Sequence, residues 1–163
     1  MNKRNDKKLE ATALAALLAL SALTLFGAPA MTPPDEVLLT GWLHVDDRTV
    51  NDLVLVVELD GDRCLFAEVH ASGRFEVLVP VGCKALLSFI KPGHLTKEVV
   101  VDTRNAMNTT KAQQTNRKVK FDVVLEPIEK RLGRKYQGPV GSLIFVNGTG
   151  TMKVKHDLRV VAK

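Results

Sequence analysis

The residues with the most versatile chemistry in this chain are its four histidines, because imidazole acts as an acid, a base or a metal ligand near neutral pH: His44, His70, His94 and His156. None of the four has a second histidine, Asp or Glu at a spacing typical of a zinc site. His70 is expected to point outward from a strand, and His94 is expected in a turn. The sequence therefore favours isolated structural or surface histidines, and it predicts no bound metal and no cofactor.

Other candidates for chemistry are a short acidic turn and two glycines late in the chain. Asp60-Gly61-Asp62 offers two carboxylates for calcium, but it lacks the extended acidic loop of a tight site, so a simple turn is favoured. Gly148 and Gly150 are not followed by a Lys-Ser or Lys-Thr pair, which favours a hairpin turn over a phosphate-binding loop. No Ser, Thr or Cys stands in a nucleophile motif. We therefore predict no catalytic residue and a chain that is not an enzyme.

Two cysteines, Cys64 and Cys83, leave their pairing open. Cys83 shares strand parity with inward residues such as Ala85, whereas Cys64 has the opposite parity to an expected inward set that includes Leu65. These registers place the two thiols on different faces. A hairpin around Ser72 nevertheless brings Cys64 within a few residues of Cys83, and a β-bulge could still join them in a disulfide.

Charge is distributed unevenly along the chain, although the net formal charge is only +5. Residues 31–126 hold 11 basic and 14 acidic side chains, whereas residues 127–163 hold eight basic and two acidic ones. The candidate interaction residues are basic side chains of this C-terminal part: Lys130, Arg131, Arg134, Lys135, Lys153, Lys155 and Arg159. The pattern is compatible with a solvated basic face and with a surface that binds an acidic partner.

The elements that position these side chains are predicted to be β-strands, because apolar and polar residues alternate over short runs bounded by turn residues. The predicted strands cover residues 37–45, 53–59, 64–70, 74–79, 84–90, 97–102 and 119–125. The predicted core includes Phe75, Val77, Leu87, Phe121 and Val123. Seven short strands at near-regular spacing predict an all-β sandwich. The polar segment 103–118 is predicted to be an exposed, mobile loop.

Residues 128–163 are predicted to form a basic C-terminal β-ribbon, after a linker or short turn at 128–137. Strands are expected over 141–146 and 151–161, joined by the hairpin sequence at 147–150. The ribbon either adds to an edge of the sandwich or stands as a separate appendage. Alternation predicts that it packs through an apolar face and shows a basic face outward. The apolar face contains Met152, Val154 and His156, and the basic face contains Lys153, Lys155 and Arg159.

The first 30 residues are typical of an export signal. A basic start precedes an uncharged run, 11–30, which is rich in Ala and Leu and ends in Ala28-Pro29-Ala30. This run is compatible with a signal helix that is cleaved after Ala30 and with an uncleaved membrane anchor. Residues 31–37 then form a linker. The segment predicts a protein of the periplasm or cell envelope, or a secreted one, with membrane contact only through an uncleaved N-terminus.

Several short motifs resemble the carboxypeptidase-regulatory-like domain, a transthyretin-like (prealbumin-like) sandwich common in bacterial envelope proteins. They are Gly41 in the first strand, the Gly73-Arg74-Phe75 turn, Pro80-Val81-Gly82, Lys91-Pro92-Gly93-His94 and Asp122-Val123-Val124-Leu125-Glu126-Pro127. The resemblance covers about residues 38–127 and implies a seven-stranded, Ig-like Greek-key sandwich. Cys83-Lys84 and His94 depart from the family pattern, in which aromatic residues are frequent at these places.

The resemblance implies a binding, spacer or assembly module, because the zinc ligands of metallocarboxypeptidases lie in a separate catalytic domain. The transthyretin fold also has a hydrolase branch, whose Tyr-Arg-Gly-Ser motif is echoed by Tyr136-Gln137-Gly138-Pro139 without its Arg and Ser. We therefore expect a non-catalytic envelope module that contacts protein or glycan, with an acidic surface as one candidate partner. The low aromatic content, 5%, argues against nucleic acid. The alternatives are a small-ligand carrier and an uncharacterised hydrolase.

Overall fold

The computed structural model describes residues 35–46, 49–131 and 133–162. The predicted signal segment, residues 1–30, and most of the predicted linker, 31–37, lie outside the described residues. Within the described ranges, no helix is both long and apolar enough to cross a membrane.

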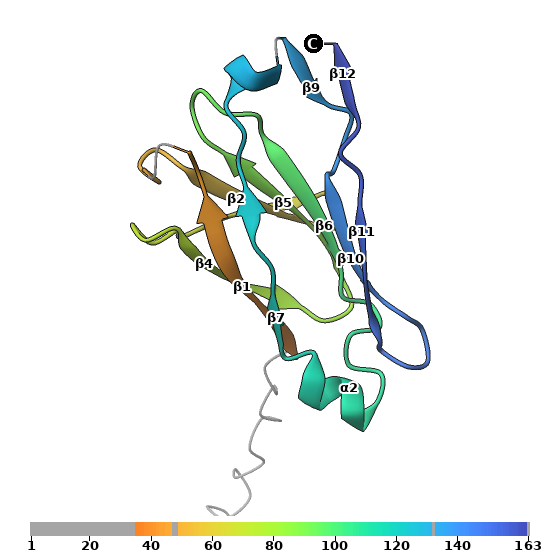
Figure 1. Ribbon diagram of the computed structural model, residues 1–163. Helices are drawn as coiled ribbons and strands as arrows, with labels where there is room; N and C mark the ends of the chain where they lie inside the picture. The colour runs from red at the N-terminus through yellow and green to blue at the C-terminus, as the bar shows by residue number, and fades with distance from the viewer. Residues whose placement is uncertain (1–34, 47–48, 132, 163) are drawn as a thin grey trace, which may run out of the picture. The chain divides into compact units, whose positions relative to one another are not determined.

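β-strands are the main regular structure of the described chain, which has almost no helix, and this confirms the all-β prediction. Its two larger sheets pack face to face (Figure 1). The smaller of the two is organised around β1. Its strands are β1 (Glu36–His44), β4 (Arg74–Pro80), β7 (Lys118–Lys120) and β8 (Val123–Val124). β4 pairs antiparallel with one side of β1, and β7 and β8 pair parallel with the other side.

The larger sheet has six strands in the order β11-β10-β6-β5-β2-β3. They are β2 (Val54–Leu59), β3 (Arg63–Ala67), β5 (Lys84–Ile90), β6 (Lys97–Asp102), β10 (Gly141–Phe145) and β11 (Met152–His156). β10 runs parallel to β6, and the other neighbours run antiparallel. A third, two-stranded sheet pairs β9 (Arg134–Tyr136) with β12 (Val160–Ala162).

The hydrophobic core lies between the two larger sheets and is formed by alternate residues of their strands. Phe75 of β4 and Phe89 of β5 meet edge to face, with ring centroids 5.4 Å apart. Phe121 meets Phe75 in the same way at 5.3 Å. The predicted core is confirmed for four residues, which are buried, whereas Phe121 is only partly buried. The four are Phe75, Val77, Leu87 and Val123.

Gly41 of β1 lies against the interruption between β7 and β8, where the backbone comes very close. A Cβ atom at Gly41 would stand only 1.6 Å from the carbonyl oxygen of Phe121, so that only glycine fits there. One residue further on, the Asp122 side chain enters the ladder, because its Oδ1 accepts from the backbone N–H of Trp42 at 3.0 Å. The predicted seventh strand, 119–125, is therefore two short strands, although its odd-numbered residues still face the core.

The segment predicted as an exposed loop, 103–118, is held in place and contains a short helix, α2 (Thr110–Thr115), with Thr109 as its N-cap. The side-chain amide of the buried Asn116 donates to the carbonyl oxygen of Gly150 at 2.8 Å, in the turn between β10 and β11. Much of the segment is exposed, as predicted, but it is not a plain loop, because side-chain hydrogen bonds pack part of it against a distant turn.

The predicted third strand, 64–70, is shorter and more exposed than its pattern indicates. Leu65 pairs with Val57 and so lies on the inner face, as predicted, but it is 50% exposed because β3 is an edge strand. The predicted parity of the cysteines is consistent with the structure, in which Cys64 is exposed and Cys83 is buried. Both thiols are free, so the structure contains no disulfide between Cys64 and Cys83.

The C-terminal ribbon adds to the edge of the larger sheet, which decides between the two positions left open by the sequence. The predicted hairpin is confirmed, since β10 and β11 pair antiparallel and β10 pairs with β6. The predicted linker, 128–137, instead holds a 3-10 helix, η1 (Ile128–Arg131), and β9. The predicted last strand, 151–161, is interrupted, because the chain leaves β11 and then returns as β12 to pair with β9.

Candidate binding groove

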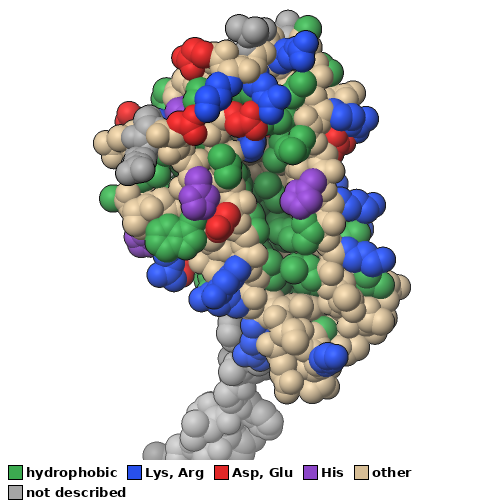
Figure 2. All heavy atoms as spheres, in the orientation of Figure 1, with side chains coloured by type: hydrophobic (Ala, Val, Ile, Leu, Met, Phe, Trp, Pro, Cys, Tyr) green, Lys and Arg blue, Asp and Glu red, His purple; other side chains and the backbone are tan. Residues whose placement is uncertain are grey.

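An open groove lies between residues 121–124, at the β8 end of the smaller sheet's edge, and the inner face of β6, β10 and β11. Figure 2 shows it as a hollow with hydrophobic side chains between the two halves of this face. Its volume is about 190 Å³. The groove arises because β10 and β11 extend the larger sheet sideways, whereas the smaller sheet ends at β7 and β8.

The floor and the walls of the groove are aliphatic. Val99 of β6 and Leu143 of β10 are buried in its floor. Val124 on one wall and Val154 on the other are 52% and 49% exposed. Leu143 and Val154 are directly paired in the β10–β11 ladder, so they share the inner face of the hairpin. The walls therefore offer exposed apolar surface to a ligand.

Figure 2 shows a histidine side chain on each side of the hollow. On the β8 side, His44 Nε2 lies 3.4 Å from Asp122 Oδ2. On the opposite side, His156 of β11 lines the groove. An imidazole carries both a donor and an acceptor in its neutral form, so a histidine beside the groove can bind a polar group of a ligand.

Lys97 also lines the groove, and its charge is compensated by a network around Glu126. The Lys97 side chain is only 9% exposed, and its Nζ lies 3.4 Å from Glu126 Oε1. The same Nζ lies 5.3 Å from the centre of the Tyr136 ring. Glu126 further accepts from the Tyr136 hydroxyl at 2.8 Å and from Arg131 Nε at 2.7 Å. The network ties η1 and β9 to β6.

The network also sets the protonation states of Glu126 and Tyr136. Burial acts to raise the pKa of Glu126, but hydrogen bonds from Tyr136 and Arg131 outweigh it, so that the pKa is lowered. Burial and the hydrogen bond to Glu126 raise the pKa of Tyr136 to about 12. Near neutral pH, Glu126 is therefore ionised and Tyr136 is neutral. This charge distribution suits a structural role for the lysine and does not make it a free nucleophile.

The described residues of the groove form an arrangement suited to binding. No hydrogen bond joins a Ser, Thr or Cys side chain to His44 or His156 among the described residues. In the same part of the chain, no group of three His, Cys, Asp or Glu side chains is placed to hold a metal ion. An aliphatic recess with a few polar groups at its rims has the composition of a ligand-binding site.

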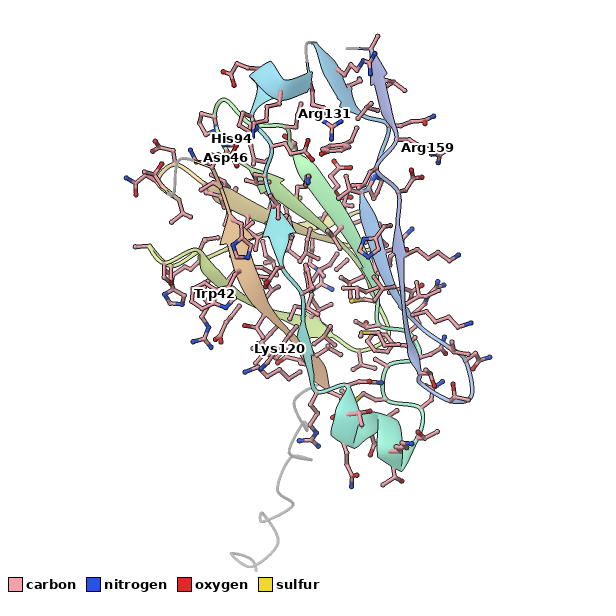
Figure 3. The ribbon with its side chains drawn as sticks, in the orientation of Figure 1. Trp42, Asp46, His94, Lys120, Arg131 and Arg159 are labelled. Atoms are coloured by element: carbon pink, nitrogen blue, oxygen red, sulfur yellow. The ribbon has the colours of Figure 1, made fainter. Side chains whose placement is uncertain are left out.

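The seven basic candidates from the sequence are not gathered into one surface. Three are held in ion pairs: Lys130 with Asp46, Arg131 with Glu126 and Arg159 with Asp157. The other four are exposed: Arg134 and Lys135 on β9, and Lys153 and Lys155 on β11. In Figure 3, Arg131 and Arg159 both lie in the upper part of the view, with Arg159 farther to the right. The predicted basic face is thus limited to two lysines of β11, because Arg159 lies beyond the end of that strand.

The prediction that the ribbon docks through Met152, Val154 and His156 is wrong, because all three are exposed. The hairpin is attached through β10, whose Leu143 and Phe145 are buried and whose backbone pairs with β6. The apolar side of β11 borders the groove instead. Sequence alternation correctly marked an inward face, but the local pattern contained no information on whether another strand covers it.

Comparisons of the chain with protein-family models, with curated proteins and with solved structures found no match. The resemblance to the carboxypeptidase-regulatory-like domain accordingly stays a prediction. The groove is interpreted from its own residues, and these are the basis of the function proposed below.

Proposed function

We propose that this chain is a non-catalytic binding module that holds an apolar segment of a partner protein in its groove. The observation that carries the proposal is the inner face of the β10–β11 hairpin, over which the smaller sheet, as described, places no strand. Val154 and Leu158 at this groove are 49% and 57% exposed. Covering apolar surface contributes about 25 cal/mol per Å², so a segment that fills the groove gains binding free energy.

A protein segment suits the groove better than a glycan, because the lining is mainly aliphatic. A sugar requires many hydrogen bonds, and the polar side chains that line the groove are few: Lys97, Asp122, Ser142 and His156. Apolar side chains of a peptide match the valine and leucine surface of the groove. The polar side chains are then left to bind polar atoms of the same segment.

We further propose that the module is exported and acts in the cell envelope. The support is the basic start, the uncharged run 11–30 and Ala28-Pro29-Ala30, all of which precede the described residues. A transthyretin-like Greek-key topology belongs to the same proposal and is supported by the motif order within residues 38–127. N-terminal sequencing of protein from the envelope fraction should begin at Met31, whereas an intact Met1 in the cytosol would contradict export.

Site-specific photo-cross-linking in intact cells tests the proposed groove. A benzophenone amino acid at position 154 faces the groove, and the same probe at position 153 faces the other side of β11 as a matched control. We expect an adduct with one partner protein at position 154 but not at 153, and its loss when Val124→Asp is added. Equal adducts at both positions, or none at either, would contradict a protein partner in the groove.

A small-ligand carrier is the second candidate, and the limited volume of the groove, about 190 Å³, favours it. Such a volume suits a compact apolar molecule with a polar group that reaches Asp122 or His156. Native mass spectrometry of the purified protein separates the two candidates. A small molecule that is retained by the wild type and lost in Val154→Asp supports the carrier, whereas an empty groove together with the position-154 adduct supports the protein-binding module.

A further inference from the structure

The β7–β8 edge carries main-chain groups that are not used by β1. In a parallel ladder, alternate residues direct their N–H and C=O groups to one neighbour, and the residues between them point to the other side. Phe121 N–H donates to the Thr40 carbonyl oxygen at 3.1 Å, so the odd-numbered residues of this segment face β1. The peptide groups of Lys118, Lys120 and Val124 therefore point away from β1, to a side on which no described strand pairs with them.

The uncovered hairpin lies where a strand on that side would be placed. A strand that pairs with β7–β8 continues the smaller sheet across the inner face of β10 and β11. Every second side chain of such a strand points into the groove, toward Val99, Leu143 and Val154. One added strand thus meets two requirements, because it pairs the free edge and covers the exposed apolar face.

The outer face of β7 determines which charges an added strand can carry on its own outer face. Lys118 and Lys120 are exposed on the outer face of β7, and within the described chain neither forms an ion pair. Figure 3 shows Lys120 at this edge, below Trp42. Side chains of an added strand that stand opposite these lysines lie on the same outer face. Asp or Glu at those places pairs with the lysines, whereas Lys or Arg is repelled.

We propose that the partner binds by strand addition to the β7–β8 edge, through an extended segment in which apolar residues alternate with acidic ones. The apolar set enters the groove, and the acidic set faces Lys118 and Lys120. This inference rests on the proposed function, since it specifies the segment that the same groove takes. The other occupants are a second copy of the chain, the chain's own N-terminal segment and a small apolar molecule.

The first experiment compares two synthetic peptides in fluorescence anisotropy with the purified full chain. One peptide alternates Val with Glu, and the matched peptide alternates Val with Lys. We expect the Val-Glu peptide to bind at least about tenfold more tightly, because its outer side chains pair with the lysines and those of the matched peptide are repelled. Equal affinities would overturn the acidic half of the pattern.

Charge reversal provides matched protein variants. Lys118→Glu combined with Lys120→Glu should weaken the Val-Glu peptide about tenfold and strengthen the Val-Lys peptide. Lys153→Glu combined with Lys155→Glu changes the net charge equally but on the outer face of β11, and it should alter both affinities by less than about twofold. All four lysines are exposed, so each variant should fold, and thermal melts should be used to check this. Equal effects of the two double variants would overturn recognition at β7.

N-methylation of alternate peptide residues tests the main-chain pairing. In a bound strand, every second N–H points to β7–β8, so one methylated set should lose at least about tenfold in affinity while the other is tolerated. Sensitivity of the Glu set indicates an antiparallel strand, and sensitivity of the Val set a parallel one. If both sets are tolerated while Val154→Asp still abolishes binding, strand addition is overturned but the groove remains the binding site.

The remaining outcomes also decide the proposal. If Val154→Asp leaves peptide binding unchanged, both the strand addition and the groove are overturned. If neither peptide binds, the proposed pattern is overturned, and the position-154 cross-link then judges the proposed function separately. Peptide binding that appears only after removal of residues 1–34 assigns the groove to the chain's own N-terminal segment. A dimer that Val154→Asp dissociates assigns it to a second copy, and a retained small molecule assigns it to a carrier.

Discussion

The two edges of the smaller sheet differ in how they meet solvent (Figure 1). On one edge, β4 is a continuous strand of seven residues, and its outer side chains Arg74 and Glu76 form an ion pair. The chain entering β4 also forms a bridge between Val69 and Phe75, which occupies part of that edge. The other edge is divided into β7 and β8, has lysines without a described ion-pair partner, and borders an open groove.

The contrast shows two ways of controlling a strand edge. An exposed edge recruits other strands unless it is shortened, charged or occupied. The β4 edge is occupied in part and its charges are paired. The β7–β8 edge is charged by Lys118 and Lys120, which repel a strand carrying further lysines but attract one carrying carboxylates. The first edge is thus partly occupied and has its charges paired, whereas the second has positive charges, unpaired within the described chain, that favour an acidic strand over a basic one.

Replacement of aromatic rings should give the largest difference between the two edges. Phe75→Ala, on β4, should lower the free energy of unfolding by about 3–5 kcal/mol, because the ring is fully buried against Phe89 and Phe121. Phe121→Ala, between β7 and β8, should cost less because that ring is only partly buried. Denaturant melts measure both. Arg74→Ala is the exposed control, and a loss equal to that of Phe75→Ala would show that the β4 register is wrong.

Gly41→Ala should destabilise the protein by forcing β1 away from the segment that joins β7 and β8. The added methyl group meets the Phe121 carbonyl at 1.6 Å, so the backbone must move, at a cost of about 3 kcal/mol. Gly138→Ala is the matched control, because nothing lies within 4 Å of the atom it adds. Thermal or denaturant unfolding should distinguish the two variants clearly. Similar stability in both would mean that the close approach of Phe121 to Gly41 does not exist in solution.

Glu126→Gln should destabilise the protein by about 2 kcal/mol at neutral pH, because Lys97 is left buried without its counter-charge. The folded-state pKa of Glu126 is lowered, so its contribution is complete above its ordinary pKa of 4.5 and is lost as pH falls through the folded-state value. The stability difference between wild type and variant should therefore shrink below about pH 4.5. Glu129→Gln, on exposed η1, is the control. A difference that is independent of pH would contradict the network.

Charge reversal on the outer face of β11 should have the smallest effect on stability. Lys153→Glu combined with Lys155→Glu should leave the melting curve nearly unchanged, because both side chains are exposed and unpaired in the described structure. If this face binds an acidic envelope surface, the variant should be released from the envelope fraction at lower salt than the wild type. Identical retention of both proteins across a salt series would leave these lysines as a solvated face.

Strands with local alternation could be predicted from the sequence, but the groove could not. Phe75 and Val77 alternate with polar residues in one short strand, which predicts an inward face, and turn residues flank that strand on both sides. The groove combines Val99, Val124 and Val154 from three strands that are far apart in sequence. Its existence depends on the relative widths of two sheets, which no single run of residues encodes.

The incorrect predictions of which residues are buried have related physical causes. Leu65 has the alternation of a core residue, yet it is half exposed because β3 is an edge strand. Nothing in the sequence of β3 indicates whether another layer covers it. Asn116 belongs to a polar segment, yet it is buried because its amide reaches the carbonyl of Gly150, 34 residues later. Local patterns report which way a side chain points, whereas burial also depends on partners supplied by distant parts of the chain.

The parallel pairing of β10 with β6 also sets the order in which the binding site is completed. β6 pairs with β5, which precedes it in the chain, whereas the β10–β11 hairpin is translated about 40 residues after β6. A nascent or truncated chain that ends before Gly141 has no second wall and leaves the β6 edge unpaired. A partner that needs both walls of the groove would therefore bind only a chain that extends through β11.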